Sequence, residues 1–116
     1  IVRSESKDGG KTWAEGRDTE FPNPNAAVDF IKLENGHLLL VYNDAMRGRS
    51  PLRVALSEDG DKSYPFRRNV KEGPGDFGYP VAFQAKNGTI HLVYTSERRQ
   101  VVNHATFDEA WVKQGQ

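Results

Sequence analysis

The chain contains no cysteine, which excludes disulfide bonds, thiolate metal sites and cysteine nucleophiles together. It also has no net charge, because 16 lysines and arginines balance 16 aspartates and glutamates. A balanced chain has no overall field that attracts a phosphate backbone or an anionic membrane surface. We therefore expect neither a nucleic-acid partner nor a membrane partner.

Long apolar runs are missing as well. No stretch approaches the ~20 apolar residues of a membrane-spanning helix, and there is no signal-peptide pattern. The first residue is Ile1 rather than Met, so we expect a chain trimmed or excised from a longer one. The 116 residues suit one domain with a modest core.

What the sequence does contain is an octet that occurs twice. Residues 6–13 read SKDGGKTW and residues 57–64 read SEDGDKSY, an offset of 51 residues. Such a pattern indicates a tight turn, in which the aspartate accepts backbone N–H bonds, glycine allows positive φ, and the aromatic side chain leaves the turn to pack. The positions that define the turn are Ser6, Asp8, Gly10, Thr12, Trp13, Ser57, Asp59, Ser63 and Tyr64.

Two hairpins repeat with nearly the same period. Asn-Gly pairs at residues 35–36 and 87–88 each lie between two apolar runs, which favours a tight β-turn, and their offset is 52 residues. The dipeptide Val-Tyr at residues 41–42 recurs at residues 93–94. Independent features that share one period indicate a repeat architecture of the propeller type.

The fold class expected from this pattern is all-β, with four-stranded antiparallel propeller blades. About nine strands are predicted, over residues 1–6, 14–20, 27–33, 37–42, 52–56, 67–71, 80–85, 89–95 and 101–107. They form the end of one blade (1–22), a complete blade (23–73) and an incomplete last blade (74–116), about two and a quarter blades in total. Residues 108–111 are expected to be a decayed octet or a terminal plug.

The octets resemble Asp boxes, the S-x-D-x-G-x-[ST]-[WYF] turns of the sialidase-type β-propellers. This resemblance implies that each octet joins the third and fourth strands of a blade. A six-bladed ring needs about 24 strands at four per blade, so one copy does not close a ring. We expect either a homo-oligomer, in which a trimer closes a six-bladed ring, or a fragment of a longer chain.

A second resemblance covers residues 23–111, which are similar to the C-terminal part of bacterial sialidase-like proteins. It rests on residues 43–52 (NDAMRGRSPL), 78–80 (GYP), 87–95 (NGTIHLVYT), 98–99 (RR) and 108–111 (DEAW). The resemblance implies that Arg49 belongs to the arginine triad that grips the substrate carboxylate and that Tyr79 is the nucleophile. It also implies a carboxylate base, a general acid and the first triad arginine from earlier blades, which this sequence does not match.

The chemistry of sialic acid suits these two residue types. A guanidinium group pairs bidentately with a carboxylate, which a lysine does not imitate. The sugar bears its carboxylate on the anomeric carbon, so an anionic Asp or Glu nucleophile would be repelled and a neutral phenol would not.

Each candidate residue also has a plainer interpretation. Tyr79 fits a wedge between blades equally well, and Arg49 fits a solvated loop arginine, with Arg47 as the alternative substrate-binding arginine. Asn25 and Asp29 are candidates for contact with a sugar, but they also suit a role in tying down the loop that connects two blades.

No metal and no cofactor are expected. Asp59 and Asp61 flank a glycine, but the other oxygen ligands of a calcium loop are absent. The histidines at positions 37, 91 and 104 fall on separate predicted strands without the spacing of a zinc site. The arginine pairs at residues 67–68 and 98–99 are expected to face solvent.

Three functions are compatible with these observations. The first is a sialidase-like propeller segment that is incomplete or inactive as a single chain and has an anionic, sialic acid-like sugar as its ligand. The second is a non-catalytic, lectin-like carbohydrate-binding module, and the third is a structural or protein-interaction propeller. Fold alone does not choose between them, because one fold hosts many functions.

Overall fold

A computed structural model describes residues 1–115, so Gln116, the end of the expected last blade, lies outside the described residues. Within them the chain forms nine strands and one short helix. The three antiparallel sheets are β1 (Val2–Arg3) with β2 (Arg17–Asp18); β3 (Asp29–Lys32), β4 (Leu38–Asn43), β5 (Leu52–Ser57) and β6 (Phe66–Lys71); and β7 (Gly78–Gln84), β8 (Ile90–Ser96) and β9 (Val101–Phe107). The all-β class is confirmed, with sheets of two, four and three strands in chain order and no closed barrel among the described residues.

The two Asn-Gly hairpins have the same hydrogen bonds, which explains their common sequence. In the β3–β4 turn the N–H of Leu33 donates to His37 O at 2.8 Å and the N–H of Gly36 to Leu33 O at 2.9 Å. The β7–β8 turn repeats both bonds at the same distances, with Gly88 in the place of Gly36. Both glycines have φ near 90°, which a side chain would disfavour.

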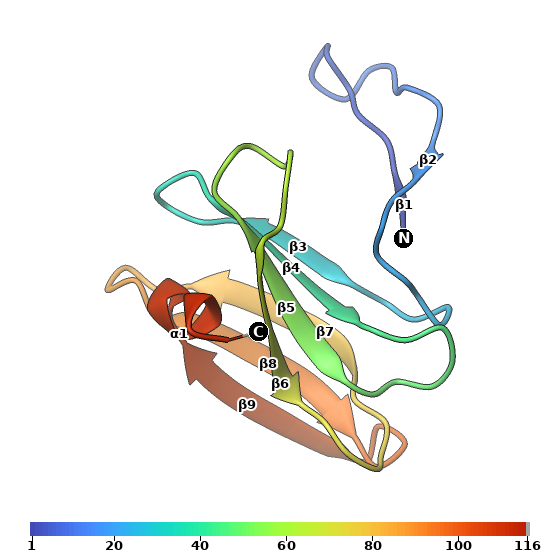
Figure 1. Cartoon of the computed structure of the whole chain (residues 1–116), viewed down its shortest axis with the longest axis vertical. Helices are drawn as coiled ribbons and strands as arrows, with labels where there is room; N and C mark the ends of the chain where they lie inside the picture. Colours follow the sequence, from blue (N-terminus) through green and yellow to red (C-terminus); the bar gives the residue numbers. More distant parts are fainter. Residues whose placement is uncertain (116) are drawn as a thin grey trace.

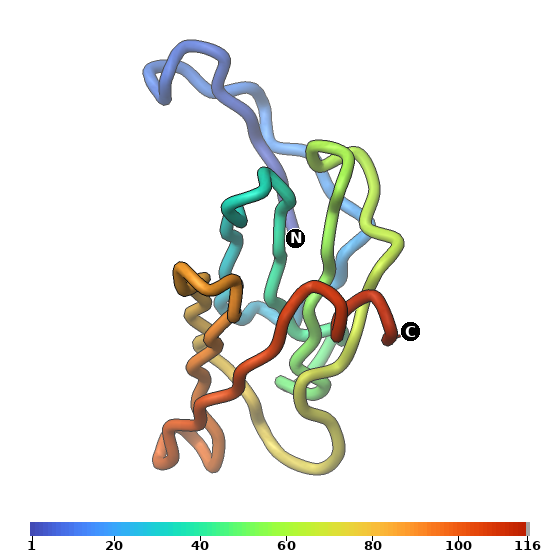
Figure 2. The backbone as a smooth tube through the Cα atoms, turned by 90° about the vertical axis from the view of Figure 1, so that its left-hand side faces the viewer, coloured from blue at the N-terminus to red at the C-terminus, as the bar shows by residue number. Residues whose placement is uncertain are grey.

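The main core lies between the four-stranded and the three-stranded sheet, which face each other as two layers (Figures 1 and 2). Alternate residues along a strand point to opposite faces, so every second side chain of β4, β5, β7 and β8 enters this layer. The fully buried members include Leu39, Val41, Val54, Ile90 and Leu92.

The opposite face of the four-stranded sheet has a core of its own. Leu40, Tyr42 and Ala55 point to this side and are covered by Phe21 and Tyr64. The Phe21 ring meets the rings of Tyr42 and Tyr64 edge-on, each with centroids 5.2 Å apart. Both faces of the central strands are thus buried, which explains why β4 and β5 read as nearly continuous apolar runs.

The helix α1 (Glu109–Lys113) follows β9, so of the two expectations for residues 108–111 the decayed octet is wrong. Asp108 caps the helix, since its side chain accepts the N–H of Trp111 at 2.8 Å. Val112 is fully buried in the main core, and the Arg68 guanidinium stacks on Trp111 at 4.1 Å from the ring centroid. Among the described residues no helix has the length and apolar character needed to cross a membrane.

The first hairpin projects away from the two layers (Figure 2). Its strands β1 and β2 have two residues each, much shorter than expected, although the ribbon continues through the bond from Ala14 N–H to Glu5 O at 2.8 Å. A two-stranded ribbon without a third strand has little to hold a regular ladder.

Candidate functional site

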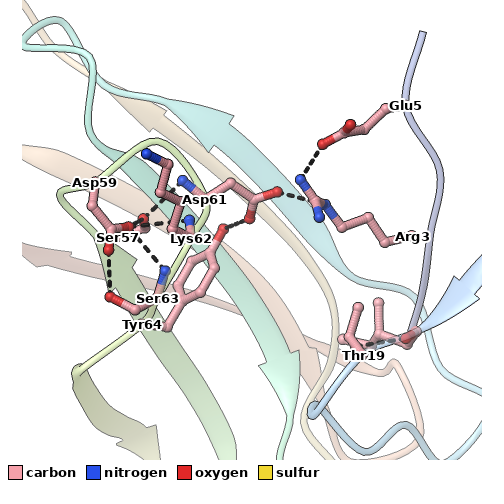
Figure 3. Close-up of polar contacts among 10 residues, drawn as sticks. Arg3, Glu5, Thr19, Ser57, Asp59, Asp61, Lys62, Ser63 and Tyr64 are labelled. Atoms are coloured by element: carbon pink, nitrogen blue, oxygen red, sulfur yellow. Dashed lines mark hydrogen bonds and ion pairs between the residues drawn. The ribbon is translucent and has the colours of Figure 1, made fainter.

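Both octets fold into the same turn, which is organised by one aspartate. In the second octet Asp59 Oδ1 accepts the N–H groups of Lys62 and Ser63 at 3.1 and 2.9 Å, and Oδ2 accepts the Ser63 hydroxyl at 2.5 Å (Figure 3). The Ser57 hydroxyl donates to Asp59 Oδ1 at 2.9 Å. These bonds, led by that of the Ser63 hydroxyl, lower the pKa of Asp59 to about 2.

The first octet repeats this arrangement around Asp8. Its carboxylate accepts the N–H groups of Lys11 and Thr12 at 3.1 and 2.9 Å, the Thr12 hydroxyl at 2.6 Å and the Ser6 hydroxyl at 2.8 Å. The pKa of Asp8 is also lowered to about 2, chiefly by the Thr12 hydroxyl. The carboxylates of Asp8 and Asp59 thus shape the two turns.

The octets differ in how they contact their surroundings. Asp61 replaces Gly10 at a position with positive φ, and its carboxylate bonds the Tyr64 hydroxyl and pairs with Arg3 Nε at 2.6 Å, which ties the second octet to the first hairpin (Figure 3). Tyr64 is buried as expected, but Trp13 is 65% exposed, which corrects the expectation that it packs. Trp13 belongs to a two-stranded hairpin, which has no broad sheet surface on which its ring can pack.

The candidate functional site lies at the opposite end of the sheets from α1. Loops β4–β5 (44–51), β6–β7 (72–77) and β8–β9 (97–100) gather there (Figure 1). The N–H of Phe77 donates to Arg49 O at 2.7 Å, and the Ser50 hydroxyl donates to Gly73 O at 2.7 Å. The buried Asn43 side chain donates to Phe77 O at 2.8 Å, so these bonds fix the first two loops to each other.

Tyr79 is presented by a distortion of β7. Gly78 pairs with Thr95 but Val81 pairs with Val93, so the strand holds one extra residue and forms a β-bulge. Tyr79 lies in this bulge with φ of 50°, a left-handed conformation that costs a non-glycine residue roughly 1–2 kcal/mol. The bulge leaves the side chain 43% exposed, so its phenol is open to a ligand.

Two arginines surround the phenol of Tyr79. The Arg49 guanidinium lies over its ring, with Cζ 5.0 Å from the centroid, and Arg99 Nη1 donates to the phenolic oxygen at 3.3 Å. Hydrogen bonding by Arg49 is the largest cause, and that by Arg99 the next, of a pKa of Tyr79 below its ordinary value. The structure therefore brings the two candidates Arg49 and Tyr79 together and adds Arg99.

Arg49 reaches this position because residue 78 is glycine. A Cβ at Gly78 would lie 3.1 Å from both Cδ and Nη1 of Arg49, tighter than ordinary contact. The arginine side chain thus lies directly against the backbone that leads into Tyr79.

Arg98 and Arg99 are exposed, as expected, but Arg99 also contacts Tyr79. Glu97, Arg98 and Arg99 all have positive φ, of 50°, 56° and 70°, and the N–H of Arg98 donates to both carboxylate oxygens of Asp76 at 2.9 and 3.2 Å. This loop turns Arg99 toward a residue 20 positions earlier. The sequence offers only the adjacent arginines as a signal, because no glycine marks the left-handed turn.

The other arginine pair is also engaged rather than simply solvated. Arg67 pairs with Glu20 at 2.9 Å, donates to Tyr64 O at 2.9 Å and lies over the Phe21 ring at 4.7 Å. Arg68 stacks on Trp111 as described above. Both arginines hold covering elements against the four-stranded sheet.

The remaining candidates lie apart from the phenol contacts. Arg47 and Asn25 are exposed on loops, with Asn25 at φ of 62°. Asp29 uses both carboxylate oxygens on backbone groups: one accepts the N–H of Phe30 at 3.0 Å and the other the N–H of Ala82 at 2.7 Å. The structure thus gives Asp29 a contact that joins β3 to β7.

Two histidines that the sequence separates lie together in the fold. His91 Nδ1 and His104 Nε2 are 2.9 Å apart on β8 and β9, and the Phe83 ring stacks on His91. A pair is short of the three or four protein ligands of a zinc site. Within residues 1–115 no group of three or more His, Asp or Glu side chains is placed to hold a metal ion.

A family model described as a BNR repeat-like domain matches residues 1–92. The chain belongs to this family. The match spans most of the chain and includes both octets, Arg49 and Tyr79, whereas Arg99 lies beyond its end. No curated protein matches the chain.

Membership in the BNR repeat-like family accounts for the repeated turns and places the chain among Asp-box, sialidase-like proteins. Each of the two octets joins the last two strands of its sheet: β1 to β2 and β5 to β6. In this BNR repeat-like chain the octets connect strands at one end of the sheets, while Arg49, Tyr79 and Arg99 lie at the other end.

Proposed function

We propose that this chain provides half of a sialidase-type glycosidase site, with Tyr79 as nucleophile and Arg49 as the residue that grips the substrate carboxylate. The observation that supports this proposal is the phenol of Tyr79, exposed on a bulge and flanked by two guanidinium groups. Two cations favour both a carboxylate ligand and the phenolate form of the nucleophile.

In the proposed reaction the phenolic oxygen bonds to the anomeric carbon as the bond from that carbon to the leaving oxygen breaks. The phenolic proton passes to a carboxylate base, and the leaving oxygen takes a proton from a general acid. The phenolic oxygen has two guanidinium partners in the described part of the chain rather than a carboxylate base. We therefore propose that a single copy is incomplete as an enzyme and needs further residues from a longer polypeptide or from other copies.

The test of this function is hydrolysis of a fluorogenic sialoside by the assembled chain or by a longer polypeptide that contains it, with Tyr79→Phe and Arg49→Gln as variants. Tyr79→Phe is expected to abolish turnover while leaving sugar binding intact, because only the nucleophilic oxygen is lost. Arg49→Gln is expected to raise KM, because it removes the bidentate partner of the carboxylate. Turnover by Tyr79→Phe at the wild-type rate would remove Tyr79 from the nucleophile role.

A second candidate function is a lectin-like module that binds anionic sugars without cleaving them. The two arginines beside the phenol favour this alternative. Nuclear magnetic resonance titration with N-acetylneuraminic acid, and with its neutral methyl ester as the matched ligand, would reveal it. Binding of the acid alone that survives Tyr79→Phe, without turnover, is the expected result for a lectin-like module.

We also propose that copies of the chain associate, with a trimer as the assembly that comes nearest to a six-bladed ring. Support comes from the incomplete strand counts of the first and third sheets within residues 1–115. Association would place several Arg49 and Tyr79 side chains in one assembly.

A further inference from the structure

Arg99, on the β8–β9 loop, contacts Tyr79 and lies outside the family match. Three successive non-glycine residues, 97–99, adopt left-handed backbone conformations there. Each costs roughly 1–2 kcal/mol relative to the right-handed form. Such a loop persists only where its surroundings over-determine it, and strain of this kind gathers at functional sites.

The loop is held from outside by Asp76. Both carboxylate oxygens of Asp76 accept the N–H of Arg98, at 2.9 and 3.2 Å, and the N–H of Gln100 closes the turn on Ser96 O at 3.1 Å. The Arg98 backbone is thus anchored to loop β6–β7, which leads directly into Tyr79. One anchor sets the position of the next residue, Arg99, relative to the phenol.

Arg99 and Arg49 reach the phenol of Tyr79 from different loops. Arg99 Nη1 donates to the phenolic oxygen at 3.3 Å, and Arg99 Cζ lies 5.7 Å from the ring centroid. Arg49 approaches from loop β4–β5 with Cζ 5.0 Å from the same centroid. Arginines from two different loops therefore contact the Tyr79 side chain.

We propose that Arg99 is a positioning residue for Tyr79, held by Asp76 and the left-handed loop so that its guanidinium stabilises the phenolate of Tyr79. A cation that donates to an oxygen favours the charged form of that oxygen over the protonated form. When Tyr79 ionises, its proton passes to a base in solution and both guanidinium groups remain charged. This inference deepens the proposed function, because an easily ionised Tyr79 serves catalysis only if Tyr79 is the nucleophile.

Ionisation of Tyr79 can be measured without any substrate. The chain has four tyrosines, and burial raises the pKa of Tyr42, Tyr64 and Tyr94, whereas the two arginines lower that of Tyr79. Tyr79 is thus expected to titrate first as the pH rises. Nuclear magnetic resonance of chains labelled at the tyrosine ζ-carbon follows each phenol separately, and Tyr79→Phe assigns the signal.

The decisive comparison is Arg99→Gln against Arg98→Gln, which remove the same charge from adjacent residues of one loop. We expect Arg99→Gln to move the Tyr79 midpoint upward, toward the ordinary value, and Arg98→Gln to leave it nearly unchanged. Arg99→Lys, which keeps the charge, should restore part of the shift. Equal midpoints in Arg99→Gln and Arg98→Gln would overturn the proposal.

A second pair of variants tests the anchor. Asp76→Asn and Asp76→Ala both remove the negative charge, but only asparagine keeps an oxygen that accepts the N–H of Arg98. The Tyr79 midpoint is expected to be higher in Asp76→Ala than in Asp76→Asn, and equal midpoints would remove Asp76 from the mechanism. An early-titrating Tyr79 whose replacement by phenylalanine leaves sialoside turnover unchanged would uphold the role of Arg99 and reject the proposed nucleophile, so the two failures are distinguishable.

Discussion

Single side chains with several hydrogen-bond partners define the local geometry of this chain. Asp8 and Asp59 each organise a turn, Asn43 connects two loops, and Asp61 links an octet to the neighbouring hairpin. These residues are polar, and their hydrogen bonds and ion pairs fix the positions of their side chains. Substitutions that remove one partner at a time therefore give the sharpest tests at this scale.

Ser63→Ala is expected to raise the pKa of Asp59 from about 2 toward 3.8, because the Ser63 hydroxyl is the largest cause of its depression. The pKa of Asp8 should stay at about 2 in the same molecule, since its own partner Thr12 is unchanged. Carbon-detected nuclear magnetic resonance of the carboxylates measures both values. An equal rise at both aspartates would indicate a global change of the fold instead.

The same shifts predict how stability depends on pH. A carboxyl with a lower pKa in the folded state than in the unfolded state stabilises the fold above its unfolded value, here 3.8. That stabilisation is lost as the pH falls through about 2. The midpoint of urea unfolding should thus decline between these pH values, and the decline should be shallower in Asp8→Asn/Asp59→Asn.

Asn43→Ala is expected to lower the free energy of unfolding by about 1–3 kcal/mol, because it leaves the buried Phe77 carbonyl without its donor. Urea denaturation measures the loss. Gln100→Ala, on an exposed loop, is the control and should change stability by no more than about 0.5 kcal/mol. A matching loss in the two variants would deny Asn43 this role.

At the scale of elements, the sequence predicted what local patterns determine. Asn-Gly pairs fix the β3–β4 and β7–β8 hairpins, and the repeated octets fix the turns after β1 and β5, so the order and number of strands were predictable. The helix α1 was not predictable, because an aspartate such as Asp108 caps a helix as readily as it stabilises a turn. The contact of Arg99 with Tyr79 was not predictable either, because it depends on a left-handed loop that contains no glycine.

The cap of α1 can be tested with a matched pair of variants. Asp108→Ala should destabilise the chain by about 0.5–2 kcal/mol, because it removes the acceptor for the Trp111 N–H. Asp108→Asn keeps that acceptor and should cost much less. The comparison uses urea unfolding followed by Trp fluorescence, and equal losses would contradict the capping role.

Gly78→Ala is expected to displace Arg49 from the Tyr79 ring, because the new Cβ would lie 3.1 Å from the arginine side chain. The Tyr79 midpoint should then rise, while the free energy of unfolding changes by no more than about 1 kcal/mol, since the end of a flexible side chain can move. In an Arg49→Gln background Gly78→Ala should have no further effect on that midpoint. An additive effect in the double variant would show that Gly78 acts by another route.

At the scale of the whole molecule, the third sheet has an open edge and exposed apolar side chains that another sheet can contact. Strand β9 forms its open edge and contains no charged residue, and Val81, Phe83 and Val102 are 59, 55 and 70% exposed. Uncharged edges and exposed apolar side chains favour association with another sheet. These features are the physical basis for the proposed assembly.

Light scattering should therefore show association that increases with concentration, and Val102→Lys should weaken it by placing a charge on the open edge. Gln100→Lys adds the same charge on the adjacent loop and is the control. A monodisperse monomer at every concentration would reject the trimer, and equal weakening by both variants would exclude the β9 edge as the contact.

The carboxylate of Asp29, on β3, holds Ala82 of β7 through a contact internal to one chain. The relative position of these two neighbouring sheets is therefore set by a contact within the chain, and it does not depend on how many other sheets surround them. Arg49 lies on the loop between β4 and β5 of the first of these sheets, and Tyr79 lies on β7 of the second. Their spacing is thus a built-in property that the chain would bring unchanged into any larger architecture.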